Sequence, residues 1–281
     1  MPREVAGEDF GGAEVGGEAR LNSVTLPVAA LASAGVAGIA WRTGTLTASG
    51  AVAAWTVGVL VLHGTGWAGG AVLAAFFISS NLISRAAGRV VRSDLDPKGE
   101  RRDHWQVYAN GGPAAVAALA GPSNTSLAIW LVTASLAAAA ADTWATSTGT
   151  RSRVPPRLLW SGRTVAAGTN GGVTLAGSVG AVAGAAIVAG TGAISTGLPF
   201  LFPVATLIGF AGMLADSLLG GVLQGRFHCS RCDQPSEWRV HRCGSTTVRR
   251  AGLGWLNNDG VNFLATALAA GAGLAAWRLL D

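Results

Sequence analysis

The sequence predicts an all-α, polytopic membrane protein with about seven or eight transmembrane helices. Half of the 281 residues are hydrophobic and only 12% are charged, and the mean hydropathy is +0.42. This balance is typical of a chain that crosses a bilayer several times rather than of a soluble globule. The 41 glycines also suit the close helix–helix approach that is found in lipid.

The apolar runs place the spans, because a helix needs about 20 apolar residues to cross a bilayer. The runs predict spans near residues 24–42, 46–62, 66–84, 109–121, 125–142, 171–190, 197–220 and 261–280. The fourth run is short and contains glycine and proline, so seven spans with one re-entrant or half helix is the alternative. We expect residues 23–281 to form a single transmembrane domain, and residues 1–22 to be a disordered acidic tail.

The basic residues predict the orientation of the spans. Sixteen of the 20 lysines and arginines fall in three loops that follow alternate spans, near residues 85–107, 143–167 and 221–256. The intervening turns carry none, so the positive-inside rule places all three loops in the cytoplasm. We therefore expect a multi-pass protein of the cell membrane, with the lipid bilayer and no nucleic acid as a partner.

Unusual polar motifs lie at the ends of the predicted spans. Asn110-Gly111-Gly112 and Asn170-Gly171-Gly172 are expected to begin the fourth and sixth spans, and the segment 257–262 is expected to begin the eighth. Asp142 and Asp216 are expected to end the fifth and seventh spans. All of these ends fall on the cytoplasmic face, so the sequence predicts one site there.

The three predicted helix starts indicate a binding site for phosphate. A helix N-terminus offers unpaired N–H groups and about half a positive charge. Glycines let an anion approach the backbone, and asparagine adds an amide donor. The predicted phosphate- or nucleotide-binding residues are Asn110, Gly111, Gly112, Thr169, Asn170, Gly171, Gly172, Ser217, Asn258, Asp259 and Asn262. The structural alternatives are that each Asn-Gly-Gly is only a turn or helix start, and that Asp259 only complements the helix dipole.

Asp142 and Asp216 are the predicted catalytic residues and Mg²⁺ ligands. A carboxylate at the centre of a membrane helix costs about 2.5–3.5 kcal/mol, and the C-terminal end of a helix disfavours negative charge. Bound Mg²⁺ offsets both effects, because it takes carboxylates together with substrate phosphates. The arrangement resembles a phosphoryl-transfer site. Snorkelling or pairing with arginine is the structural alternative.

The same motifs suggest a parallel internal repeat. One half runs from Asn110 to Asp142 and the other from Asn170 to Asp216. Membrane folds built from repeats often bind their substrates at the interface between the repeats. Gln224 follows Asp216 by eight residues and shares its face if the helix continues; a solvated loop amide is the alternative.

All three cysteines lie in the third basic loop, as Cys229-x₂-Cys232 and His241-x-Cys243. This Cys₃His set has a spacing that suits a structural Zn²⁺ with four protein ligands, and free thiols without a metal are the alternative. A cytoplasmic loop keeps its thiols reduced. His104 and His228 stand alone and are expected to be ordinary loop residues.

A nucleotide has to bind without a lysine-containing phosphate loop. The chain lacks the Gly-x₄-Gly-Lys-Ser/Thr pattern, and Lys98 is its only lysine. Arginine, asparagine and backbone amides remain as phosphate ligands. The candidate arginines that flank the motifs are Arg85, Arg101, Arg102 and Arg163.

Five ordered blocks resemble the transmembrane-protein-19-like integral membrane family, which includes the plant phytyl-phosphate kinase of the tocopherol salvage pathway. The blocks are Gln106-Val107-Tyr108-Ala109-Asn110-Gly111-Gly112, Ala141-Asp142-Thr143-Trp144-Ala145-Thr146, Gly168-Thr169-Asn170-Gly171-Gly172-Val173, Asp216-Ser217-Leu218-Leu219-Gly220 and Asn258-Asp259-Gly260-Val261-Asn262. The resemblance spans about residues 80–265. It implies that a prenyl monophosphate is phosphorylated to the diphosphate with a nucleoside triphosphate, CTP or ATP. The family usually carries an acidic residue where this chain has Ser147.

The predicted function is therefore a membrane-embedded kinase for phytyl or geranylgeranyl phosphate, acting at the cytoplasmic face. Two alternatives use the same residues: a CTP-dependent lipid-phosphate cytidylyltransferase, and a transporter of an anionic solute. The concentration of polar motifs at one face favours an enzyme, since a transporter carries polar groups near the middle of the bilayer.

Overall fold

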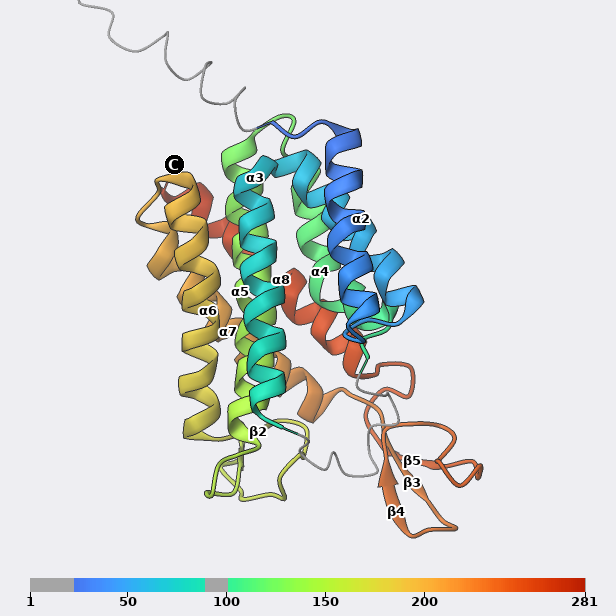
Figure 1. Ribbon diagram of the computed structural model, residues 1–281. Helices are drawn as coiled ribbons and strands as arrows, with labels where there is room; N and C mark the ends of the chain where they lie inside the picture. The colour runs from blue at the N-terminus through green and yellow to red at the C-terminus, as the bar shows by residue number, and fades with distance from the viewer. Residues whose placement is uncertain (1–22, 89–100, 281) are drawn as a thin grey trace, which may run out of the picture.

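The computed structural model describes residues 23–88 and 101–280. Its helices are α2 (Leu26–Arg42), α3 (Ala48–Ala86), α4 (His104–Ala118), α5 (Thr125–Gly149), α6 (Leu175–Thr196), α7 (Leu201–Val222) and α8 (Asn258–Leu280). They form one bundle, and the strands and the two long connections, 150–174 and 223–257, lie at one end of it, here called the loop end (Figure 1). The predicted tail at 1–22 lies outside the described residues, as do Arg89, Arg92 and Lys98 of the first basic loop.

The helices confirm the predicted polytopic, all-α membrane class. Within the described residues, α3, α5, α6, α7 and α8 are long and apolar enough to cross a membrane, and α2 is a shorter apolar helix. Large apolar side chains on the outer helices are exposed, among them Leu31 at 75%, Ile194 at 86% and Leu207 at 69%. An apolar exterior of this kind suits contact with lipid, because its exposure to water would be unfavourable.

Helix α3 contains two of the predicted spans. Its backbone is non-helical at Gly66 (φ 65°, ψ −160°), a conformation that glycine adopts without steric cost. Thr47, just before α3, donates its N–H to Arg102 O, and Ala86 O, at the end of α3, accepts from Arg151, both at the loop end. Gly66 therefore separates an outgoing segment from a returning one, as the predicted spans 46–62 and 66–84 require.

Helix α5 forms the centre of the bundle. It packs against α3, α4, α6, α7 and α8, and every residue from Ala128 to Ala141 is buried. Because all its faces contact other helices, α5 carries small apolar residues on every side rather than along one stripe. Trp130 Nε1 donates to Gly273 O at 2.9 Å, which ties α5 to α8.

Side-chain caps decide where the helices at the loop end begin, and they correct two predictions. Asp103 and Gln106 form a capping box at the start of α4, and Thr174 caps α6 by accepting from the N–H of Gly177. These caps satisfy N–H groups that the first turn leaves unpaired. Helix α4 therefore begins at residue 104 instead of 109, and α6 begins at 175 instead of 171.

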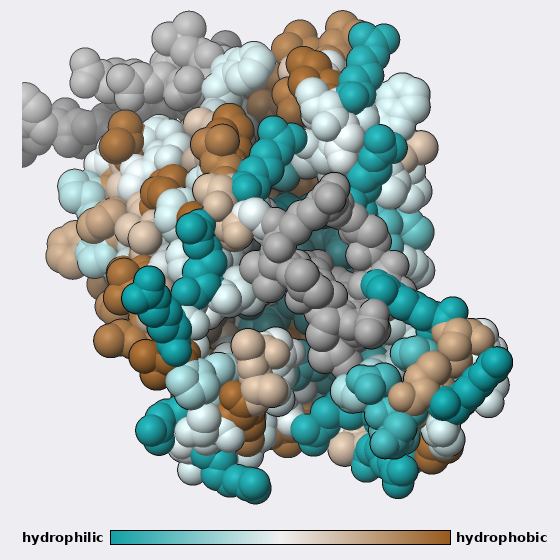
Figure 2. All heavy atoms as spheres, turned by 60° about the horizontal axis from the view of Figure 1, so that its bottom comes forward, coloured by the Kyte–Doolittle hydropathy of each residue, from teal (hydrophilic) through white to brown (hydrophobic). Residues whose placement is uncertain are grey.

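Two small antiparallel sheets lie at the loop end, and the sequence analysis did not predict them. Strands β1 (Arg157–Leu158) and β2 (Gly172–Val173) pair within the connection before α6. Strands β3 (Arg226–Cys229), β4 (Gln234–Ser236) and β5 (Val248–Ala251) form a sheet of order β4-β3-β5 between α7 and α8. Hydrophilic side chains gather around this end of the molecule, and hydrophobic ones lie on the flank of the bundle (Figure 2).

Candidate active site at the loop end

A polar cavity of about 620 Å³ opens at the loop end. Helices α3 to α8 line it together with both connections. The predicted residues that the structure brings to its wall are Asn110, Asp142, Thr169, Asn170, Gly171, Gly172, Asp216, Ser217, Asn258, Asp259 and Asn262. Segments separated by more than 100 residues in the chain therefore meet in one cavity.

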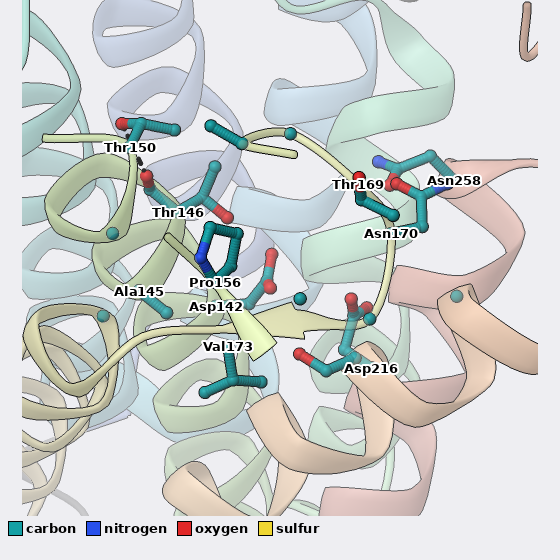
Figure 3. A pocket seen from close by; sticks show the side chains of 18 of the residues that line it. Asp142, Ala145, Thr146, Thr150, Pro156, Thr169, Asn170, Val173, Asp216 and Asn258 are labelled. Atoms are coloured by element: carbon teal, nitrogen blue, oxygen red, sulfur yellow. Dashed lines mark hydrogen bonds between the residues drawn. The ribbon is translucent and has the colours of Figure 1, made fainter. Parts of the chain in front are cut away.

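Asp142 on α5 and Asp216 on α7 point into this cavity (Figure 3). The two carboxylates are close enough to interact electrostatically. Asp216 Oδ2 is buried and has no hydrogen-bond partner among the described residues. A divalent cation would satisfy the buried Asp216 oxygen and relieve the repulsion between the two charged carboxylates, so the pair has the chemistry of a divalent-metal site.

The predicted placement of these aspartates at helix ends was wrong. Helix α5 continues to Gly149 and α7 continues to Val222, so both carboxylates lie in the body of their helices. The end of a helix dipole acts only within the last turn and does not account for their position. Thr146 follows Asp142 by one helical turn and points into the same cavity (Figure 3).

Asn110-Gly111-Gly112 has a different role from the predicted one, because it lies inside α4 and not at its start. An added Cβ at Gly111 would lie 3.1 Å from Val57, and one at Gly112 would lie 3.4 Å from Phe263. The glycines therefore let α4 pack closely against α3 and α8. Asn110 lines the cavity, and its Nδ2 donates to Gln106 O at 2.9 Å.

Asn170-Gly171-Gly172 lies in the connection before α6 and does not begin that helix. The N–H of Gly172 donates to Thr169 O at 3.0 Å, so it is already used within the loop. Asn170 Nδ2 donates to Glu237 Oε1 at 2.9 Å. The two copies of the Asn-Gly-Gly sequence thus adopt different local structures, and neither forms the predicted helix-start cradle.

The start of α8 does have the predicted geometry. The helix begins at Asn258, and Asn257 Oδ1 accepts from the N–H of Gly260 at 3.0 Å. Asn258, Asp259 and Asn262 all line the cavity. Helix α8 therefore directs the positive end of its dipole at the cavity, where it favours an anion.

Several cavity residues were missed or left open by the sequence analysis. Gln224 is 1% exposed, and neither Oε1 nor Nε2 has a partner among the described residues, which contradicts the solvated alternative. Helix α7 ends at Val222, so the helix does not continue to Gln224 as its expected shared face with Asp216 requires; Gln224 lines the cavity from the connection that follows α7. Glu237, Trp238 and Arg153 also line the cavity and were not predicted. Of the candidate arginines, Arg102 lines it, whereas Arg85 donates to Thr45 Oγ1 outside it.

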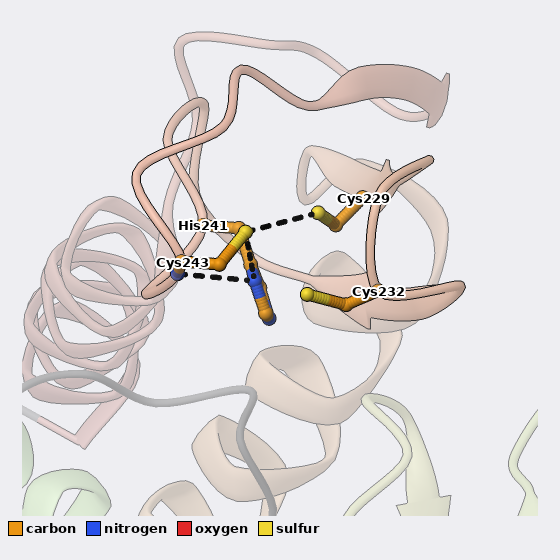
Figure 4. A group of neighbouring side chains, drawn as sticks. All are labelled: Cys229, Cys232, His241 and Cys243. Atoms are coloured by element: carbon orange, nitrogen blue, oxygen red, sulfur yellow. Dashed lines mark hydrogen bonds between the residues drawn. The ribbon is translucent and has the colours of Figure 1, made fainter.

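The predicted cysteine–histidine cluster is assembled beside the β3–β5 sheet (Figure 4). One ligand atom from each of Cys229, Cys232, His241 and Cys243 lies within 4.8 Å of the others. Cys229 Sγ is 3.7 Å from Cys243 Sγ, and His241 Nδ1 is 3.2 Å from the same sulfur. Soft thiolates together with one imidazole make the donor set of a structural zinc site.

The cluster also shifts the pKa values of two of its thiols, Cys243 and Cys232, in opposite directions. Hydrogen bonds from Ser245 and then from His241 lower the pKa of Cys243 to about 5. A hydrogen bond with Cys243 raises the pKa of Cys232 to about 11. The two lone histidines lie outside the cavity wall: His104 Nδ1 contacts Ser49 Oγ at 3.2 Å, and His228 Nε2 contacts Asp233 Oδ1 at 3.0 Å.

A bundle of membrane-length helices with a polar cavity at one end defines a multi-pass integral membrane protein. The chain belongs to the family described as integral membrane protein DUF92, whose model matches residues 31–270. This match confirms the resemblance drawn from the five sequence blocks.

Relatives of the chain come from plants, archaea and cyanobacteria. The chain is 31% identical over 261 residues to Protein PGR of Arabidopsis thaliana, covering 79% of this chain and 86% of that protein. It is 29% identical over 175 residues to an uncharacterized membrane protein of Methanocaldococcus jannaschii, covering 62% and 73%. It is also 29% identical over 219 residues to an uncharacterized membrane protein of Synechocystis, covering 74% and 80%. No solved structure matches the chain.

Proposed function

We propose that the protein is a prenyl-phosphate kinase that transfers the terminal phosphoryl group of CTP or ATP to phytyl or geranylgeranyl phosphate. The observation that carries the proposal is the pair Asp142 and Asp216, which faces a polar cavity at the end of a membrane bundle. A phosphorylated lipid has a charged head and an apolar tail. The polar residues of the cavity can bind the head, and the apolar helices beside the cavity can contact the tail.

The two aspartates fit Mg²⁺. Asp216 Oδ2 is buried without a partner among the described residues, and Asp142 adds a second carboxylate beside it. Oxygen ligands of this kind, completed by substrate phosphates, are what Mg²⁺ prefers. When bound, the ion neutralises charge on the phosphates during transfer. Asp142 and Asp216 would hold it from two different helices, α5 and α7.

Other cavity residues supply positive charge and hydrogen-bond donors to the phosphates. Arg102 and Arg153 line the cavity, and the N-terminus of α8 directs its dipole there. In the reaction, an oxygen of the prenyl phosphate bonds to the terminal phosphorus, and the bond from that phosphorus to the bridging oxygen breaks. The nucleoside diphosphate leaves. The acceptor is already anionic, so no residue has to remove a proton from it.

The location of the polar residues supports an enzyme at the cytoplasmic face over a transporter. The described basic loops share the end of the bundle that carries the cavity, and the positive-inside rule assigns such loops to the cytoplasm. A transporter needs a substrate site near the middle of the bilayer, whereas the middle of α5 is closed by alanine and leucine.

Product analysis tests the proposal. Purified protein is incubated with Mg²⁺, CTP or ATP, and either phytyl or geranylgeranyl phosphate. Asp142→Asn, Asp216→Asn and, as a charge-matched control, the exposed Asp233→Asn are measured alongside. We expect prenyl diphosphate from the wild type and from Asp233→Asn, and none from the two cavity variants. A CDP-lipid with pyrophosphate would identify a cytidylyltransferase instead, and turnover by Asp216→Asn would exclude the metal role.

A further inference from the structure

We infer that a zinc ion bound by Cys229, Cys232, His241 and Cys243 holds one wall of the cavity in place and positions Asn170 through Glu237. The wall segment consists of Glu237 and Trp238, which directly follow β4 and line the cavity. The inference does not depend on which reaction the cavity supports.

The first step is the dependence of the small sheet on the cluster. Strands β3, β4 and β5 have four, three and four residues. Sheets this small rarely fold on their own, because they bury too little apolar surface to offset the entropy of ordering the chain. Four ligand atoms within 4.8 Å of one another at the end of the sheet supply the missing stabilisation once a metal joins them, as in small zinc domains.

The second step is the connection from the cluster to the wall segment. Cys229 pairs with Gln234 across β3 and β4, which fixes the strand that leads directly into the segment. On the other side, Thr247 Oγ1 donates to Trp238 O at 2.6 Å. The N–H of His241 donates to Ser245 O at 2.9 Å in the turn that carries Cys243. The wall segment is thus attached on both sides to elements that carry zinc ligands.

The third step links the wall segment to the loop before α6. Glu237 Oε1 accepts from Asn170 Nδ2 at 2.9 Å, across 67 residues of chain. A hydrogen bond to a carboxylate is stronger than one between neutral groups, so this contact helps to set the position of the short loop. Glu237 is therefore a positioning residue: through it, the metal-organised sheet sets where Asn170 lies in the cavity.

Metal binding and order in the loop are then coupled. A metal that stabilises the wall segment also stabilises the loop, and by linkage a ligand that orders the loop tightens metal binding.

Metal analysis combined with hydrogen–deuterium exchange tests this inference in the full-length protein. Zinc content is measured for the wild type, Cys243→Ser and Glu237→Gln. Asp233→Asn is the matched control, since Asp233 lies in the same sheet region with its side chain 95% exposed. Exchange is followed in peptides covering residues 166–173 and 226–251, before and after zinc is removed with a chelator.

We expect stoichiometric zinc in the wild type, Glu237→Gln and Asp233→Asn, and its loss in Cys243→Ser. Chelation should speed exchange in both regions. Glu237→Gln should speed exchange only in 166–173, by about tenfold, the change that corresponds to about 1.4 kcal/mol, while Asp233→Asn should change neither region. The inference would be overturned if the wild-type protein bound no zinc. It would also be overturned if neither chelation nor Glu237→Gln changed the exchange rate of residues 166–173. A protein that passes these tests but makes no prenyl diphosphate would refute the kinase proposal alone.

Discussion

Gly171, in the loop before α6, lies directly against the backbone of Ser217 on α7. An added Cβ at Gly171 would be 2.9 Å from the carbonyl oxygen of Ser217, and the glycine has a φ of +80°. This contact places Asn170 next to the turn of α7 that carries Asp216. The loop and the predicted metal ligand are therefore held together by a site that only glycine can occupy.

We expect Gly171→Ala to lower turnover by at least about tenfold, since the loop has to move away from α7 and a shift of this size disturbs reacting groups. Gly168→Ala is the matched control: Gly168 has a φ of +84° but no atom within 4 Å of an added Cβ. It should lose about 1–2 kcal/mol of stability from the left-handed conformation and keep its turnover. Equal turnover losses in both variants would show that backbone strain alone is responsible.

Gln224→Met should separate stability from function. The buried amide lacks a partner among the described residues, which costs about 1–3 kcal/mol, so the apolar replacement should leave the melting temperature unchanged or raise it. Turnover should fall by about tenfold if the amide meets the substrate in the cavity. Gln234→Met, at an exposed position of β4, is the control. A lower melting temperature with unchanged turnover would contradict the prediction.

Ser147→Ala should change turnover by less than about threefold. Ser147 lines the cavity, but it follows Asp142 by five residues and so lies about 140° around α5 from it. Ser147 is therefore not an immediate neighbour of Asp142 on the helix. Steady-state kinetics check this, and a loss comparable to that of Asp142→Asn would place Ser147 among the catalytic groups.

The orientation can be checked by labelling with a membrane-impermeant maleimide. The native cysteines all lie at the loop end, so intact cells should show no labelling if that end is cytoplasmic. Ser123→Cys, in the exposed turn before α5 at the opposite end, should introduce labelling. Labelling of the native protein from outside intact cells would show that the loop end faces the outside of the cell, opposite to the expected orientation.

The sequence by itself determined the class of protein, the approximate spans, the one-sided distribution of polar motifs and the family. These features depend on composition and on local runs of apolar residues, because the length of an apolar run and the charges that flank it determine how a segment inserts into a bilayer. The clustering of Cys229, Cys232, His241 and Cys243 was also predictable, because zinc ligands recur at characteristic short spacings.

Only the tertiary structure decided the local roles of the motifs. Asp103 and Thr174 cap α4 and α6, so neither helix begins at an Asn-Gly-Gly sequence. Helices α5 and α7 continue beyond Asp142 and Asp216, so both aspartates lie within helices. Gln224 and Glu237 reach the cavity through packing between segments far apart in the chain, which no local pattern encodes. Helix boundaries and long-range contacts depend on which groups satisfy one another in three dimensions, whereas hydropathy depends on each residue alone.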